Sequence, residues 1–142
     1  MTNQAMLELC TIYYDETTLE HAKRVAEKAK NLYQIFDTSF SGGSDFLFQL
    51  GLAHELYEKT NITKKIWFDE NFENNLILLT KTSNIDYKDY ILVIQNRVFN
   101  HKNIYLPAYI VKLADISDNF AQADTLTDEL KNKYVAAISC LI

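Results

Sequence analysis

The chain has 142 residues, a length that fits one domain whose hydrophobic core needs neither disulfides nor a structural metal. Its formal net charge of −5 argues against a general nucleic-acid-binding surface, because phosphate backbones are held mainly by clustered Lys and Arg. It contains no apolar run of about 18 residues and no signal-peptide pattern, which predicts a soluble, cytoplasmic protein without membrane contact. We therefore expect residues 1–142 to form a single domain, and these bulk properties leave its oligomeric state open.

The two cysteines, Cys10 and Cys140, lie near opposite ends of the chain and follow no metal-binding or redox spacing. We interpret them as reduced thiols that pack in the core. They indicate little about function.

Apolar residues recur at intervals of three and four along most of the chain, a pattern typical of amphipathic helices. Strand-like alternation is scarce. The sequence therefore predicts an all-α, compact bundle of about six or seven helices without internal repeats. The main helical patterns cover approximately Ala5–Tyr14, Leu19–Phe36, Asp45–Lys59, Glu73–Lys81, Tyr87–Phe99 and Pro107–Ala121. A short helix is also expected at Thr63–Trp67, and a last helix begins at Thr125 or Thr127 and ends at Ile142.

Capping and turn residues set the expected boundaries of these helices. Thr17 or Thr18 is expected to cap the second helix. The segment Asp37–Ser44 contains the glycine pair of the chain and predicts a loop. Pro107 is expected in the first turn of its helix, where its missing N–H does no harm.

Three polar side chains, His54, Glu55 and Glu58, lie in the otherwise apolar run Gly51–Glu58 of the third helix. Residues four apart share one helix face, so His54 and Glu58 are predicted to line up while Glu55 flanks them. A charged residue in an apolar helix is costly unless it is paired or ligated, which favours a role for Glu55 as a ligand. The alternative is that Glu55 points outward to solvent.

A metal site that hydrolyses phosphate esters requires imidazoles and carboxylates from several elements, with positions left open for water and substrate. The chain offers His21 on the second helix, His54 and Glu55 on the third, and Asp115 near the end. Their order and helical placement resemble the HD-domain phosphohydrolase superfamily, in which a single His, a His-Asp doublet and a distant Asp form the pattern.

Further segments resemble the RelA/SpoT-type alarmone hydrolases and their small stand-alone relatives within that superfamily. The similarity extends from about Thr17 to Leu141. The matching segments are Val111–Asn119 with its Lys-Leu-Ala-Asp motif, His54–Thr60, Leu79–Lys81, Tyr87–Ile91 and Lys131–Tyr134.

The resemblance implies a metal-dependent hydrolase acting on a nucleotide pyrophosphate such as the alarmone ppGpp. The ligands of one divalent ion, expected to be Mn²⁺, would be His21, His54, Glu55 and Asp115. Glu58 would serve as the general base and handle the proton, and Asn119 would help to position the substrate. For Glu58 the alternative is a solvated helix face.

Arg24 and Lys112 are candidate phosphate contacts. Arg24 lies three residues after His21, and its guanidinium fork suits phosphate oxygens, although an ordinary exposed arginine is the alternative. Lys112 stands three residues before Asp115, so an ion pair within the helix is the alternative for both residues. His101 fits no ligand spacing and is expected at the surface.

A second hypothesis is a catalytically degenerate HD fold that binds a nucleotide or a partner protein. It rests on the His54-Glu55 doublet in place of His-Asp, on Lys59 beside Glu58, and on the acidic segment before His21. A third hypothesis, a nucleoside monophosphate phosphatase on the same scaffold, differs from the first only in its substrate.

Overall fold

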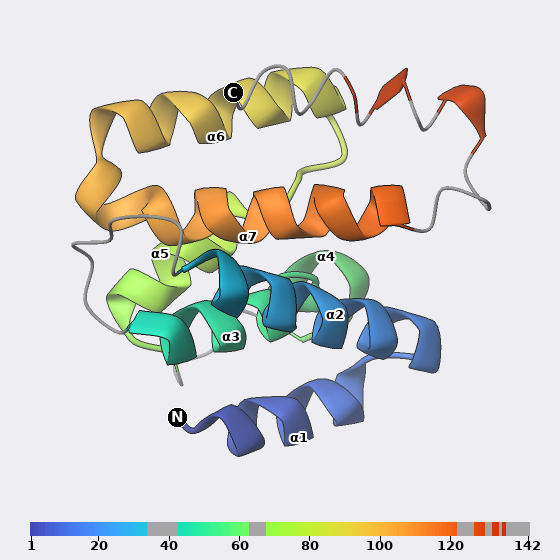
Figure 1. Cartoon of the computed structure of the whole chain (residues 1–142), viewed down its shortest axis with the longest axis vertical. Coiled ribbons are helices and arrows are strands. Elements are labelled where there is room, and N and C mark those ends of the chain that lie inside the picture. The colour runs from blue at the N-terminus through green and yellow to red at the C-terminus, as the bar shows by residue number, and fades with distance from the viewer. Residues whose placement is uncertain (34–42, 63–67, 122–126, 130–131, 134, 136–142) are drawn as a thin grey trace.

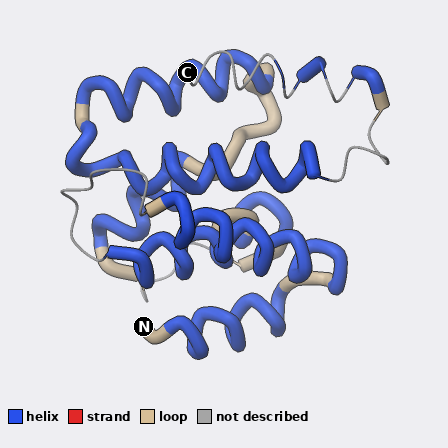
Figure 2. The backbone as a smooth tube through the Cα atoms, viewed as in Figure 1, coloured by secondary structure: helices blue, strands red, loops and turns tan. Residues whose placement is uncertain are grey.

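The computed structural model describes residues 1–33, 43–62, 68–121, 127–129, 132–133 and 135. Within these ranges the chain consists of helices and the turns beside them and contains no strand (Figure 2). The predicted all-α bundle of six or seven helices is confirmed. The helices are α1 (Asn3–Tyr13), α2 (Glu16–Leu32), α3 (Gly43–Ala53), α4 (Leu56–Lys59), α5 (Glu70–Leu78), α6 (Tyr87–Asn100) and α7 (Lys102–Ala121).

The helices stack in layers, with α6 above α7, the α2–α3 pair below α7, and α1 on the far side of α3 (Figure 1). α3 packs against α1, α2, α5 and α7, so it is the central helix of the bundle. Because α2 and α3 both pack against α7, side chains from these three helices can meet at one place.

The contact between α2 and α3 is made by small residues. Ala22, Val25, Ala26 and Ala29 form the fully buried stripe of α2. On α3, a Cβ atom added to Gly51 would lie only 2.7 Å from the Cα of Ala26. The two helices therefore approach to backbone contact at this point.

Two helices begin earlier than the sequence predicted, because an aspartate caps each of them. The carboxylate of Asp15 accepts a hydrogen bond from the N–H of Thr18, so α2 begins at Glu16, and the prediction of a cap at Thr17 or Thr18 is wrong. Asp69 caps α5 in the same way, which moves its start to Glu70.

The predicted third helix is interrupted. α3 ends at Ala53, the chain turns at His54 and Glu55, and α4 resumes at Leu56. The prediction of one helix through to Lys59 is wrong, and His54 and Glu58 do not share the face of a continuous helix. The predicted loop, Asp37–Ser44, is wrong at Gly43 and Ser44, which belong to α3, and its other residues lie outside the described ranges.

Pro107 lies inside α7, several residues beyond its start at Lys102, and its predicted place in a first turn is wrong. Proline lacks an N–H and disturbs the preceding turn, which leaves backbone groups in need of partners. The buried side chain of Asn75 supplies them: its Oδ1 accepts from the N–H of Ala108 at 3.0 Å, and its Nδ2 donates to the carbonyl of Ile104 at 2.9 Å. An amide from α5 thus bridges the interruption in α7.

The predicted helices at Thr63–Trp67 and Thr127–Ile142 lie wholly or mostly outside the described residues. Within the described ranges, no helix combines the length and apolarity needed to span a bilayer.

Candidate metal centre

His21 lies on α2 and faces two carboxylates of α7. Its Nε2 lies 2.9 Å from Oδ1 of Asp115 and its Nδ1 lies 2.7 Å from Oδ2 of Asp118. Burial lowers the pKa of His21, but the two carboxylates raise it by more, so the net pKa lies above its usual value. The raised pKa favours the imidazolium form of His21, in which both nitrogens can donate to these carboxylates.

His54 lies in the turn between α3 and α4, and its side chain is 3% exposed. Its Nδ1 lies 2.6 Å from the carbonyl oxygen of Gly51, which can only accept, so Nδ1 carries the proton. In the neutral imidazole the opposite nitrogen, Nε2, then offers an electron pair. Among the described residues it is the single buried side-chain nitrogen or oxygen without a hydrogen-bond partner.

The acids of the predicted site gather around this nitrogen. His54 Nε2 lies 3.6 Å from Oδ1 of Asp115 and 4.0 Å from Oε1 of Glu55. The candidate ligand atoms of His21, His54 and Glu55 lie within 4.8 Å of one another, and the two imidazole rings are 5.3 Å apart. The structure thus brings all four predicted ligands together from α2, the α3–α4 turn and α7.

These residues fit a divalent ion. Two imidazole nitrogens and two carboxylates are the donor set that Zn²⁺, Mn²⁺ and similar ions accept. A buried nitrogen with an available lone pair and no partner is otherwise costly, and a metal would satisfy it. The donor chemistry and the unpartnered Nε2 of His54 therefore both agree with a metal site.

Lys112 holds the other oxygen of Asp115. Its Nζ lies 2.9 Å from Oδ2 of Asp115, and both side chains are nearly buried. The Nζ also lies 5.3 Å from the ring centroid of Tyr90, close enough for a cation–π contact. Burial raises the pKa of Asp115, but Lys112, His21 and His54 lower it more, so the carboxyl stays ionised well below its usual range.

The ion pair that was the alternative for Lys112 is thus present, although the side chain still lines the pocket.

Asp118 is a site residue that sequence reasoning missed. It is fully buried, and its carboxylate accepts from Nδ1 of His21, from Nε of Arg24 at 2.9 and 3.2 Å, and from Nζ of Lys28 at 3.1 Å. Burial raises the pKa of Asp118 and these three partners lower it, with a net decrease. The available signal was spacing: Asp115 and Asp118 are three apart on α7, as His21 and Arg24 are on α2.

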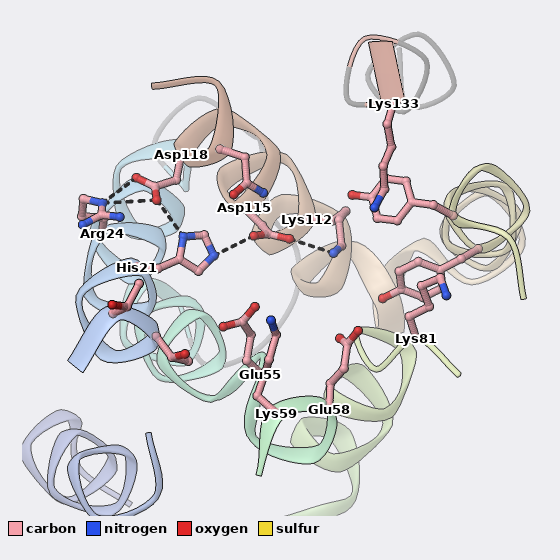
Figure 3. A pocket seen from close by; sticks show the side chains of 15 residues that line it. His21, Arg24, Glu55, Glu58, Lys59, Lys81, Lys112, Asp115, Asp118 and Lys133 are labelled. Atoms are coloured by element: carbon pink, nitrogen blue, oxygen red, sulfur yellow. Dashed lines mark hydrogen bonds and ion pairs between the residues drawn. The ribbon is translucent and has the colours of Figure 1, made fainter. Parts of the chain in front are cut away.

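The cluster opens into a pocket of about 590 Å³. Figure 3 shows Glu55, Lys59 and Glu58 together on the α3–α4 segment, with Lys112 across from them on α7 and Lys81 and Lys133 to the right. Exposed Glu58 and half-buried Asn119 both line this pocket, as predicted residues of the site. The basic side chains that line it are Arg24, Lys59, Lys81, Lys112 and Lys133.

The remaining predicted residues are placed as follows. Arg24 reaches the pocket while its Nε is bound to Asp118. His101 is exposed at the end of α6, away from the cluster, as predicted. Cys10 is a buried free thiol, whereas Cys140 lies outside the described residues.

The chain matches no protein-family profile, no curated protein and no solved structure.

Proposed function

We propose that this chain is a metal-dependent phosphohydrolase of the HD superfamily, similar to the small RelA/SpoT-type alarmone hydrolases. The observation that carries the proposal is the convergence of His21, His54, Glu55 and Asp115, with His54 Nε2 buried and unpartnered among the described residues. These four side chains would hold one divalent ion, and the expected ion is Mn²⁺.

The ion, when bound, would lower the pKa of a coordinated water and polarise a phosphoryl oxygen. The protein groups have separate tasks. Glu58, exposed at the pocket edge, is suited to accept a proton from the attacking water. Asn119 offers an amide that can donate to a substrate oxygen, and Asp118 orients the imidazole of His21 through Nδ1.

The basic residues of the pocket favour an anionic substrate. Arg24, Lys59, Lys81, Lys112 and Lys133 line the cavity together with four acids, Glu55, Glu58, Asp115 and Asp118, so the pocket has a slight excess of basic side chains in a protein whose net charge is −5. A volume of about 590 Å³ lies in the range typical of small-molecule sites. We therefore infer a nucleotide pyrophosphate as substrate, with ppGpp as the first compound to assay.

The test is pyrophosphate release from ppGpp by the purified protein with Mn²⁺. A matched pair of variants identifies the site: His54→Gln is expected to lose activity, whereas His101→Gln makes the same change on the exposed histidine and is expected to keep it. Absence of turnover with metal demonstrably bound would exclude the alarmone assignment. Release of phosphate from a nucleoside monophosphate would favour the phosphatase instead.

A second candidate is a binding module that does not hydrolyse its ligand. The favouring observation is that Asp115 already pairs with Lys112 and His21, so the cluster is partly neutralised without an ion. Metal content separates the candidates, because a ligand specific for the native state must raise its stability. An unchanged melting temperature in excess Mn²⁺ would favour the binding module.

A further inference from the structure

The turn that carries His54 and Glu55 releases backbone groups that a continuous helix would pair. In an uninterrupted helix the carbonyl of Gly51 would accept from the N–H of Glu55, and the carbonyl of Leu52 would accept from the N–H of Leu56. Instead, the Gly51 carbonyl accepts from the ring of His54. The Leu52 carbonyl and the Glu55 N–H therefore need other partners, because buried backbone groups are almost always paired.

The hydroxyl of Tyr14 pairs with both groups. It donates to the carbonyl oxygen of Leu52 at 2.6 Å and accepts from the N–H of Glu55 at 3.3 Å. The thiol of Cys10 also lies 3.4 Å from the Leu52 oxygen. Tyr14 is 7% exposed and directly follows α1, so one buried hydroxyl joins the chain on either side of His54.

This bridge favours the tautomer of His54 that a metal requires. If the Glu55 N–H lacked the Tyr14 hydroxyl, the Gly51 carbonyl would be its nearest helical acceptor. That exchange would compete with Nδ1 of His54 for the same carbonyl oxygen. The imidazole would then lose the hydrogen bond that keeps its proton on Nδ1 and its Nε2 available.

We propose that Tyr14 is a positioning residue whose hydroxyl holds the Leu52–Glu55 backbone open, so that His54 and Glu55 can both reach one metal ion. The inference rests on the proposed metal site and extends it to a residue that does not line the pocket. Through Tyr14, the segment that includes α1 would help to position the metal ligands His54 and Glu55.

The experiment measures Mn²⁺ binding by isothermal titration calorimetry for the unaltered protein and for Tyr14→Phe. Loss of an outer-shell partner typically weakens metal binding by about 10-fold to 100-fold, and we expect an increase in Kd of that size. Tyr57→Phe is the matched control, because its hydroxyl donates to the carboxylate of Glu73 outside the pocket. Its Kd is expected to change by less than about threefold, although it also loses buried hydrogen bonds.

Amide hydrogen exchange of the unaltered protein provides a second measurement that does not require the variant to fold. In the unaltered protein the Glu55 amide is expected to be protected from exchange without metal. If Tyr14→Phe folds, the Glu55 amide should exchange faster in the variant while the amides of α2 keep their rates. Rapid exchange of this amide in the unaltered protein would overturn the role of Tyr14.

The positioning role of Tyr14 and the proposed metal site can be overturned separately. A Kd for Tyr14→Phe equal to that of the unaltered protein would overturn only the positioning role. Absence of Mn²⁺ binding by the unaltered protein would overturn the proposed metal site and the role of Tyr14 with it.

Discussion

Two interruptions of the helical hydrogen-bond pattern occur in this bundle, and they serve different ends. At the α3–α4 turn, side chains of Tyr14 and His54 pair with the released backbone groups. At Pro107 in α7, the amide of Asn75 does so alone. The first leaves the Nε2 atom of His54 buried without a partner among the described residues, whereas both atoms of the Asn75 amide are paired.

The difference indicates how to distinguish a site from a structural repair. Both interruptions are buried and both depend on a side chain from another part of the chain. Only the turn at His54 adds a nitrogen with an available lone pair and acids within 4.0 Å of it. The feature that points to ligand binding is therefore a side-chain atom, Nε2 of His54, that has no hydrogen-bond partner among the described residues although the nearby backbone groups are paired.

The largest effect is expected from Asp115→Asn, which removes the carboxylate shared by the site. It leaves Lys112 buried without an anion, and breaking such a pair costs about 3 to 5 kcal/mol of the free energy of unfolding. Metal affinity should fall by more than the roughly 100-fold that loss of an outer-shell partner costs. Chemical denaturation and calorimetry measure the two effects.

The matched change Asp89→Asn, on the exposed side of α6, should leave both quantities unchanged. If Asp115→Asn bound Mn²⁺ as tightly as the unaltered protein does, the turn at His54 would have only a structural role, like the interruption at Pro107.

The next effect concerns the interruption in α7. Asn75→Ala leaves the N–H of Ala108 and the carbonyl of Ile104 unpaired in the core, which should cost about 2 to 4 kcal/mol of unfolding free energy. Mn²⁺ affinity should not change. Asn96→Ala, on an exposed position of α6, is the control and should lie within about 0.5 kcal/mol of the unaltered protein.

A loss of metal affinity in folded Asn75→Ala would show that the two interruptions are coupled, and it would remove the distinction drawn between them.

A smaller effect is expected from pH, because the α3–α4 turn lies beside the titratable side chains of the site, whereas the interruption at Pro107 is bridged by the amide of Asn75. The folded-state pKa of His21 is raised, so its contribution to stability is complete below its unfolded pKa of about 6.5 and is lost as pH rises through the folded pKa. Metal-free protein should therefore become less stable with rising pH. His21→Gln should abolish that slope, whereas Asn75→Ala should retain it.

Mn²⁺ is expected to reverse the trend, since the ion and the proton compete for Nε2 of His21 and metal binding strengthens as pH rises. Melting temperatures measured across pH with and without Mn²⁺ test this. A pH profile of the metal-free protein that His21→Gln does not alter would contradict the assignment.

The smallest effect on stability is expected from the two partly exposed cations that hold Asp118. Arg24→Gln and Lys28→Gln should each cost about 1 kcal/mol or less, because each cation is partly exposed and the buried Asp118 keeps its other two partners. Only Arg24 lines the pocket, so only Arg24→Gln should raise KM for a phosphate substrate. An equal increase in KM for both variants would show that Arg24 acts through Asp118 alone.

The periodic pattern was sufficient to predict the helical fold, whereas the meeting of His21, His54, Glu55 and Asp115 was expected from the resemblance to the HD-domain superfamily. Apolar spacing identifies the buried face of each helix, so a polar residue at the edge of such a face is recognisable as unusual. α6 was predicted to within one residue of its observed end at Asn100, since its apolar positions are strongly periodic.

The turn at His54 was not predictable from local sequence, because its stabilising partner is Tyr14, which belongs to a different helical segment. The position of Pro107 was equally difficult to predict. Proline is usually found in the first turn of a helix, and its place inside α7 depends on Asn75, which is distant in sequence. Asp118 was missed because it stands in a polar stretch that resembles a solvated surface, and only packing against α2 buries it.

The backbone contact between Gly51 and Ala26 has one more consequence. His54 follows Gly51 by one helical turn and His21 precedes Ala26 by little more than one, so this contact sets the spacing between the two imidazoles. Neither helix can move closer, and a bulkier residue at either position would force them apart. The tolerance for a larger side chain is therefore lower at Gly51 and Ala26 than at positions where a flexible side chain could move aside.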